Sequence, residues 1–246
     1  MARRRGGGLR VVARLAGAAL LASVAAALLV QVWFLGQVLW LANNDPASTA
    51  FMDARLESLR AHAALAGKRP EQVRLAQVWT PYARIAAPLK QAVVAAEDAR
   101  FLEHAGLDWE AIERAMEKNQ KRGRVVAGAS TITQQLAKNL FLSGERSWTR
   151  KAQEAIIAWM LEATLSKRRI LELYLNVAEW GEGVFGAQAA AQYHFGVSAA
   201  ALSARQAAWL AAVLPSPRRY AQGRTTPYLE RRVDVILQRM RSARIP

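Results

Sequence analysis

The sequence predicts a mainly α-helical protein in which a single N-terminal transmembrane helix precedes one helical domain. Two features predict this class. No charged residue occurs over residues 15–44. The stretch 89–214 contains no proline and is rich in Ala, Leu, Glu, Gln and Arg, which favour helices. Alternation of apolar and polar residues, the pattern of a half-buried strand, is scarce. The 246 residues are enough for one domain with its own core and an anchor.

The N-terminal segment has the length and composition of a membrane anchor. Residues 15–35 are nearly all Ala, Leu and Val, and about 20 apolar residues cross a bilayer as a helix. We therefore expect a basic cytoplasmic segment over 1–14 and a transmembrane helix over 15–41, oriented by the arginines in front of it. A cleaved signal peptide is the alternative, although the apolar run is long for one. The arginines are Arg3, Arg4, Arg5, Arg10 and Arg14.

Two further segments follow the anchor. Residues 42–79 hold short mixed stretches between prolines, which predict a stalk or linker. Residues 80–242 are expected to form the helical domain, divided by glycines into pieces of helix length. Two helix starts are predicted by capping-box spacing, from Thr131 to Gln134 and from Ser203 to Gln206.

Within this domain, Ile156, Trp159, Met160 and Ala163 follow helical spacing, so we expect them to face the core. The C-terminal stretch 231–244 predicts a basic helix. That helix either contacts anionic headgroups or presents a solvated charged face.

The charge balance indicates an anionic partner. Lys and Arg number 34 against 19 Asp and Glu, a formal charge of +15, which suits nucleic acid, anionic lipid headgroups or a phosphorylated substrate. The chain has no cysteine, which excludes disulfides and thiolate metal sites. Its three histidines have no metal-ligand spacing, so a classical zinc site is not expected.

The first candidate site residue is Glu97, which follows the wholly apolar run 92–96. On one continuous helix, Glu97, Phe101 and His104 would share a face. Partial burial at the edge of a core raises the pKa of a carboxyl towards the range of a general base. The alternative is an ordinary solvated acid at a helix end.

The second candidate site is a glycine turn that leads into hydroxyl and amide side chains over residues 128–135. A helix start offers free backbone N–H groups to anions, and amides and a lysine can bind sugar hydroxyls and phosphates. The alternative is an ordinary capped helix. The candidate binding residues are Ser130, Thr131, Gln134, Gln135 and Lys138.

The third candidate site gathers three cations around an acid. Arg146, Arg150 and Lys151 lie within six residues, and Glu154 follows one turn after Arg150. This pattern suits a phosphate clamp with a second acid inside it. An i,i+4 ion pair between Arg150 and Glu154 is the alternative.

Together with the amphipathic stretch 167–176, in which Glu172 is expected to be structural, these stretches resemble the peptidoglycan glycosyltransferase family, family 51 among glycosyltransferases. The five matches, in the family's order and spacing, are 97–106, 128–139, 150–154, 167–176 and 205–217. One departure is visible, because the family's second motif usually begins Gly-Gly and this chain has Gly128-Ala129. The chain resembles the monofunctional members, since it has no room for a transpeptidase domain.

The resemblance implies a lysozyme-like helical glycosyltransferase domain over 80–242. The implied reaction transfers the growing lipid-linked chain onto the 4-hydroxyl of GlcNAc in lipid II. It releases polyprenyl pyrophosphate and inverts the linkage to β-1,4.

The resemblance also implies a role for each candidate residue. Glu97 would be the general base, and Glu154 would orient the cations or hold a divalent metal such as Mg²⁺ or Mn²⁺. No organic cofactor is expected. The pyrophosphate would be stabilised by Lys138, Arg146, Arg150 and Lys151. The donor's sugar and phosphates would be positioned by Ser130, Thr131, Gln134 and Gln135.

The expected partners are lipid II, the growing lipid-linked glycan, the membrane, and proteins of cell-wall synthesis or division. Nucleic acid is not expected, because the predicted topology places the domain on the periplasmic side of the bacterial inner membrane, on a single-pass anchor. Two alternatives stay open. One is a lysozyme-like lytic enzyme that cleaves glycan, which would not need the cation cluster. The other is a basic membrane protein without enzymatic activity.

Overall fold

The chain forms two compact units, Met1–Leu41 and Ala42–Pro246, in a computed structural model. The structure describes residues 5–124, 128–142, 147–220 and 226–246.

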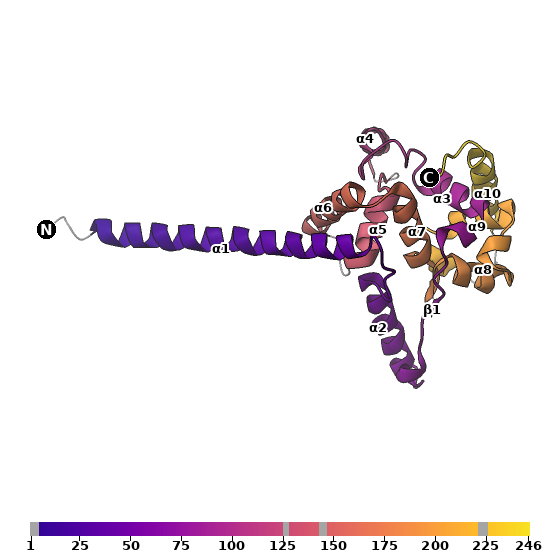
Figure 1. The fold of residues 1–246 in the computed structure, drawn as a ribbon, viewed down its shortest axis with the longest axis horizontal. Helices are drawn as coiled ribbons and strands as arrows, with labels where there is room; N and C mark the ends of the chain where they lie inside the picture. Colours follow the sequence, from indigo (N-terminus) through magenta and orange to yellow (C-terminus); the bar gives the residue numbers. More distant parts are fainter. Residues whose placement is uncertain (1–4, 125–127, 143–146, 221–225) are drawn as a thin grey trace. The chain divides into compact units, whose positions relative to one another are not determined.

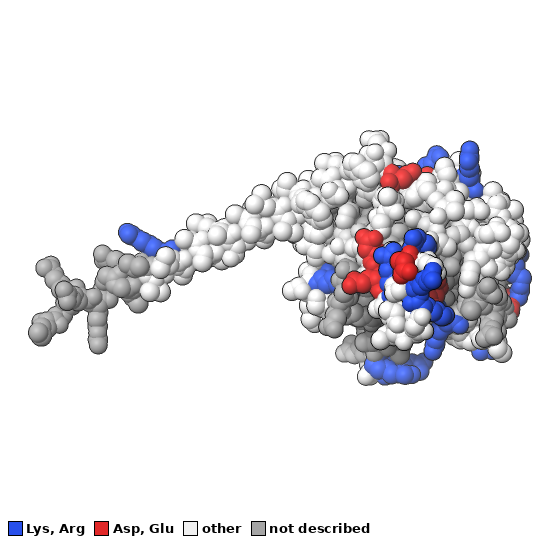
Figure 2. Space-filling view, turned by 90° about the horizontal axis from the view of Figure 1, so that it is seen from below, with Lys and Arg blue, Asp and Glu red and all other residues white. Residues whose placement is uncertain are grey.

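The first unit contains one helix, α1 (Arg5–Trp40). Its stretch Val12–Trp40 is long and apolar enough to cross a membrane, because 29 helical residues rise about 43 Å and a hydrocarbon core is about 30 Å thick. Among its described side chains, Figure 2 shows a basic group only near the N-terminal end of an otherwise uncharged rod. The anchor predicted over 15–41 lies within this helix apart from its last residue.

The second unit is mostly helical, which confirms the predicted fold class. Its α-helices are α2 (Ala50–Leu65), α3 (Ala87–Glu97), α4 (Trp109–Arg122), α5 (Ile132–Phe141), α6 (Trp148–Thr164), α7 (Lys167–Val177), α8 (Ala187–Phe195), α9 (Ala204–Val213) and α10 (Pro227–Arg239). Short 3-10 turns are η1 (Pro70–Gln72), η2 (Tyr82–Arg84), η3 (Ala199–Ala201) and η4 (Pro217–Arg219). The strands are β1 (Ala76–Gln77), β2 (Glu179–Gly181) and β3 (Val184–Phe185).

The helices of this unit pack in two groups (Figure 1). In one, α5 packs against α6, α7 and α2, and in the other α3, α9 and α10 pack against one another. The largest fully buried side chains include Trp180, Tyr174 and Phe101. The cavities described below lie where residues of both groups meet.

A small sheet with the order β1-β3-β2 connects distant parts of the chain. β1 runs parallel to β3, with Ala76 opposite Val184, and β2 runs antiparallel to β3. The turn from β3 into α8 needs a glycine, because Gly186 has φ +82° and a Cβ there would lie 2.9 Å from the Asn176 carbonyl oxygen.

The segment 42–79 is not a linker, and the prediction of a stalk is wrong. It belongs to the second compact unit. α2 buries Met52, and Arg55 forms a bidentate ion pair with Glu179 at 2.7 and 2.9 Å. Short stretches separated by prolines are typical of linkers. Here, however, α2 and β1 contact residues more than 90 positions away in the chain. Local sequence patterns do not reveal such contacts.

Both predicted capping boxes are confirmed, at the starts of α5 and α9. The predicted core face of α6 is wrong in part. Met160 is buried, but Trp159 is 64% exposed, Ile156 is 41% exposed, and Ala163 is also exposed. The core face instead carries Ile157, Ala158 and Leu161. Because α6 has apolar residues on two faces, periodicity alone does not indicate which face packs.

Candidate active site

A cavity of about 780 Å³ brings most of the predicted site residues together. It is lined by residues from the end of α3, from α5 with its preceding loop, from α6 with its preceding residue, and from the segment after α9. Seven predicted site residues line it: Glu97, Ser130, Gln135, Lys138, Arg150, Lys151 and Glu154. Of the other three, Arg146 lies outside the described residues, and Thr131 and Gln134 do not line this cavity.

Glu97 is the last residue of α3, whose apolar side chains are buried. Its own side chain is only 11% exposed. Burial raises the pKa of the Glu97 carboxyl, and the nearby charge of Asp98 adds to this effect. A hydrogen bond from Gln135 and the charges of Arg232 and Lys138 act against it. Glu97 therefore binds a proton more readily than an exposed carboxyl, while Gln135, Arg232 and Lys138 still stabilise its ionised form.

Two side chains of different helices fix the carboxylate through one hydrogen-bond chain. Gln135 Nε2 donates to Glu97 Oε2 at 2.9 Å, and the Tyr174 hydroxyl donates to Gln135 Oε1 at 2.9 Å. Burial and the charges of Glu97 and Asp98 raise the pKa of Tyr174 well above its usual value, so the hydroxyl stays a donor. The amide of Gln135 is thus held with its NH₂ group towards Glu97. The sequence did not indicate a role for Tyr174 in the site. Its contact with Gln135 arises only from the packing of α7 on α5.

The residues after Glu97 leave the helix, so the predicted shared helical face of Glu97, Phe101 and His104 is wrong. α3 ends at Glu97, and Asp98 adopts φ −160°. Asp98 instead joins two motifs, since its Oδ1 contacts His104 Nε2 at 2.9 Å and its Oδ2 accepts the backbone N–H of Ile132 at 3.0 Å.

Thr131 and Gln134 hold the start of α5. The Thr131 hydroxyl donates to the Gly106 carbonyl at 2.6 Å and accepts the Gln134 N–H, while Gln134 Oε1 accepts the Thr131 N–H at 3.1 Å. Both side chains are buried. In the structure these two side chains hold the start of the helix and do not line the cavity that contains the other candidates. The capping-box spacing in the sequence predicted these contacts.

The cation cluster surrounds Glu154, which is 4% exposed. Lys151 Nζ binds Glu154 Oε1 and lies 3.1 Å from Ser130 Oγ. Arg150 Nη1 lies 3.8 Å from Glu154 Oε2. The i,i+4 pair is thus present, and Glu154 fixes two of the three predicted cations, Arg150 and Lys151, at the cavity wall, while Arg146 lies outside the described residues.

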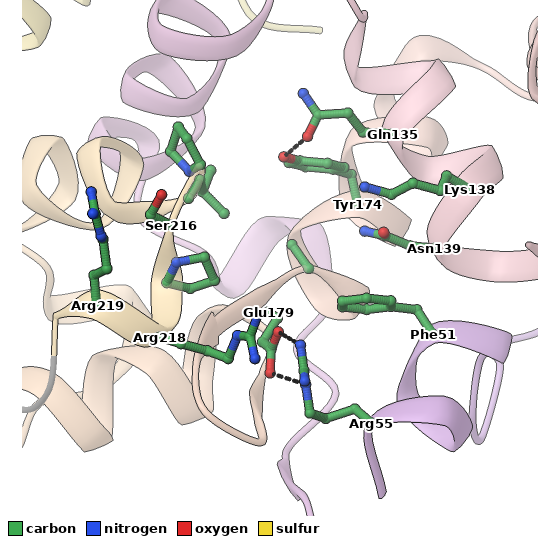
Figure 3. Close-up of a pocket in the computed structure, with 14 residues that line it drawn as sticks. Phe51, Arg55, Gln135, Lys138, Asn139, Tyr174, Glu179, Ser216, Arg218 and Arg219 are labelled. Carbon is green, nitrogen blue, oxygen red and sulfur yellow. Dashed lines mark hydrogen bonds and ion pairs between the residues drawn. The ribbon is translucent and has the colours of Figure 1, made fainter. Parts of the chain in front are cut away.

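A second cavity of about 640 Å³ adjoins the first, and both are lined by Gln135, Lys138, Leu214 and Pro215. Figure 3 shows Arg55 paired with Glu179, and Tyr174 bonded to Gln135, in its wall. Lys138 Nζ lies 5.9 Å from the centre of the Phe51 ring. Sequence reasoning missed the contribution of α2, since it treated that segment as a stalk.

Comparison with known proteins identifies the class of this domain. Residues 66–241 match the family model described as Transglycosylase, and the chain belongs to the transglycosylase family. It is accordingly an enzyme that transfers glycosyl groups.

Several similar proteins carry the name biosynthetic peptidoglycan transglycosylase. That of Herminiimonas arsenicoxydans is 55% identical over 219 residues, which make up 89% of this chain and 92% of the relative. That of Thiobacillus denitrificans is 52% identical over 97% of this chain and 100% of the relative. That of Bordetella pertussis is 52% identical over 95% of both chains.

Proposed function

We propose that the chain polymerises the glycan strands of peptidoglycan. It transfers the growing lipid-linked chain onto the 4-hydroxyl of GlcNAc in lipid II and releases polyprenyl pyrophosphate. The family and the names of the relatives support this proposal. The observation that carries it is that Glu97 and the cation cluster around Glu154 line one cavity.

Glu97 acts as the general base. It takes the proton of the 4-hydroxyl, and that oxygen attacks the anomeric carbon of the terminal MurNAc of the growing chain. Because burial favours the protonated carboxyl, the site favours proton uptake by Glu97 as the reaction proceeds. The chain from Tyr174 through Gln135 orients the carboxylate before the substrate arrives.

The leaving group is a pyrophosphate, which requires charge stabilisation and no proton. Lys138, Arg150 and Lys151 supply fixed positive charge on one cavity wall. Glu154 keeps the latter two in position through its ion pairs. Displacement by the oxygen on the face opposite the pyrophosphate inverts the anomeric carbon and gives a β-1,4 linkage.

Glu154 is a poor candidate for a metal ligand. A divalent cation such as Mg²⁺ takes several oxygen ligands. Among the described residues lining this cavity the carboxylates are Glu97 and Glu154, and both oxygens of Glu154 face cations. This donor set does not fit a divalent cation.

The reaction needs two lipid-linked sugars side by side. The two cavities share a wall that contains Gln135 and Lys138, beside Glu97. This arrangement suits a donor and an acceptor that meet at the shared wall.

The domain works at the outer surface of the bacterial inner membrane, held there by α1. Beyond the anchor, α6 presents the exposed apolar side chains of Trp148, Ile156 and Trp159. Trp148, which is 90% exposed, also lines the catalytic cavity. An apolar stripe with tryptophans at the mouth of a pyrophosphate site suits contact with the bilayer that holds the polyprenyl chain.

Two features oppose the alternatives. A lytic enzyme has a neutral glycosidic leaving group and does not need the cations around Glu154. On the face shown in Figure 2, basic side chains stand beside acidic ones, which differs from the uniformly basic face expected for nucleic-acid binding.

The test uses the full-length protein in lipid bilayers with lipid II, and in parallel with preformed glycan strands. Long strands formed from lipid II support the proposal. Shortening of the preformed strands without any polymer from lipid II contradicts it.

A further inference from the structure

We infer that Arg232, on the C-terminal helix α10, positions the Glu97 carboxylate and keeps it ionised until the acceptor hydroxyl is bound. This inference rests on the proposed function, because it takes Glu97 as the base. The stretch that contains Arg232 was expected only to contact headgroups or solvent.

The two oxygens of Glu97 have different partners. Oε2 accepts the hydrogen bond of Gln135 at 2.9 Å. Oε1 lies 3.8 Å from Arg232 Nη2, which is beyond hydrogen-bond distance. Arg232 therefore attracts Oε1 without occupying its lone pairs. Within the described parts of the chain no hydrogen bond to Oε1 is formed, so Oε1 is the oxygen that we assign to take the proton of the substrate.

α10 holds Arg232 in this position through packing. Leu229, Val233 and Ile236 are buried on the same helix, and α10 packs against both α9 and α3. Since α3 ends at Glu97, the helix that carries the arginine is packed on the helix that carries the base. The Arg232 side chain is 31% exposed and lines neither of the two cavities.

The other charged groups around Glu97 do not replace Arg232. Asp98, next to it in the chain, and Lys138 on α5 act on its pKa. Further charged side chains line the same cavities as Glu97, namely Arg150, Lys151, Glu154, Arg100, Asp108, Arg114 and Arg239. Asp98 disfavours the ionised carboxylate. Lys138 lines the shared wall of the two cavities, where pyrophosphate binding would engage its charge. Gln135 is neutral, and Tyr174 stays protonated behind it. Arg232 is thus a cation outside the pyrophosphate wall that offsets the burial of the base.

The direction of the pH effect follows from this geometry. Glu97 must be ionised to accept a proton, and its burial favours the protonated form. Removal of Arg232 raises the pKa of Glu97 further, so the acidic limb of kcat/KM moves to higher pH. At high pH, where Glu97 is ionised in either case, the loss shrinks.

The test is the pH dependence of lipid II polymerisation by the full-length protein in bilayers. Arg232→Gln removes the charge, Arg232→Met keeps the aliphatic length, and Arg232→Lys keeps a positive charge. Arg231→Gln removes an exposed arginine of the same helix and is the matched control. We expect Arg232→Gln and Arg232→Met to lose roughly tenfold in kcat/KM on the acidic limb and much less at high pH. Arg232→Lys should restore most of the acidic limb, and Arg231→Gln should match the wild type.

Two outcomes overturn the inference: an unchanged profile, or a loss of equal size at every pH that Arg232→Lys does not rescue. Either outcome can be read only if the wild-type protein polymerises lipid II. If the wild type makes no polymer, the proposed function itself fails, and the two failures are thereby distinguished.

Discussion

The side-chain amide of Gln135 lies 2.9 Å from the Tyr174 hydroxyl on one side and 2.9 Å from the Glu97 carboxylate on the other. Because the hydroxyl can only donate to the amide oxygen in this arrangement, the amide NH₂ group must face the base. The orientation of the base thus depends on a buried tyrosine of α7, which does not line the cavity that holds Glu97.

Tyr174→Phe removes the hydroxyl that fixes this amide. We expect kcat to fall roughly three- to tenfold, the worth of one neutral hydrogen bond, because the amide that orients the base is no longer fixed. Steady-state kinetics with lipid II measure kcat. Tyr228→Phe, which alters an exposed tyrosine, is the control. A kcat equal to that of the wild type in both variants would show that the hydrogen-bond chain does not orient the base.

Lys138 lies on the wall shared by both cavities. Lys138→Ala should reduce kcat by about 100-fold or more, because a preorganised charge on the leaving pyrophosphate is lost. The melting temperature should stay close to that of the wild type. Lys118→Ala, on the exposed surface of α4, removes the same charge elsewhere. Unaltered turnover in Lys138→Ala would exclude this lysine from the site.

Arg55 tests whether α2 is part of the domain. Its side chain and that of Glu179 are both largely buried, at 13% and 4% exposed. Arg55→Ala leaves the Glu179 carboxylate buried without its partner, which should cost about 3 kcal/mol of unfolding free energy. Denaturant unfolding of the full-length protein measures the change, with Arg69→Ala at an exposed arginine as the control. Equal stability of the two variants would favour a stalk.

The apolar stripe of α6 can be probed directly, because the chain has no cysteine. Nitroxide labels on single cysteines at Ile156 and Trp159 should collide more with oxygen than with a water-soluble nickel complex when the protein is in bilayers. A label at Ala200, an exposed residue of η3, should show the opposite preference. Labels on α6 that behave like the one at Ala200 would place the stripe in water. Dipolar coupling between labels of two molecules would indicate a second copy of the chain instead.

Most of the candidate residues that the sequence indicated lie together in the structure. Glu97, Ser130, Lys138, Arg150, Lys151 and Glu154 line one cavity as their ordered motifs indicated. Capping-box spacing also predicted the contacts that Thr131 and Gln134 make at the start of α5.

What the sequence did not predict depends on contacts between distant elements. Arg55 of α2 meets Glu179 across 124 residues, Tyr174 of α7 reaches Gln135 of α5, and Arg232 of α10 reaches Glu97. The exposed face of α6 was misassigned for a related reason. A helix with two apolar faces has the same periodicity whichever face meets the core.

The central claim is that Glu97 is the base of glycan-strand polymerisation. Glu97→Gln keeps the shape and the contact with Gln135 but cannot take a proton. The most direct measurement is the rate at which this full-length variant, in bilayers, forms glycan strands from lipid II. We predict a loss of at least about 100-fold with a melting temperature no lower than that of the wild type, since a buried charge has been removed. A folded Glu97→Gln protein that polymerises lipid II at close to the wild-type rate would contradict the account.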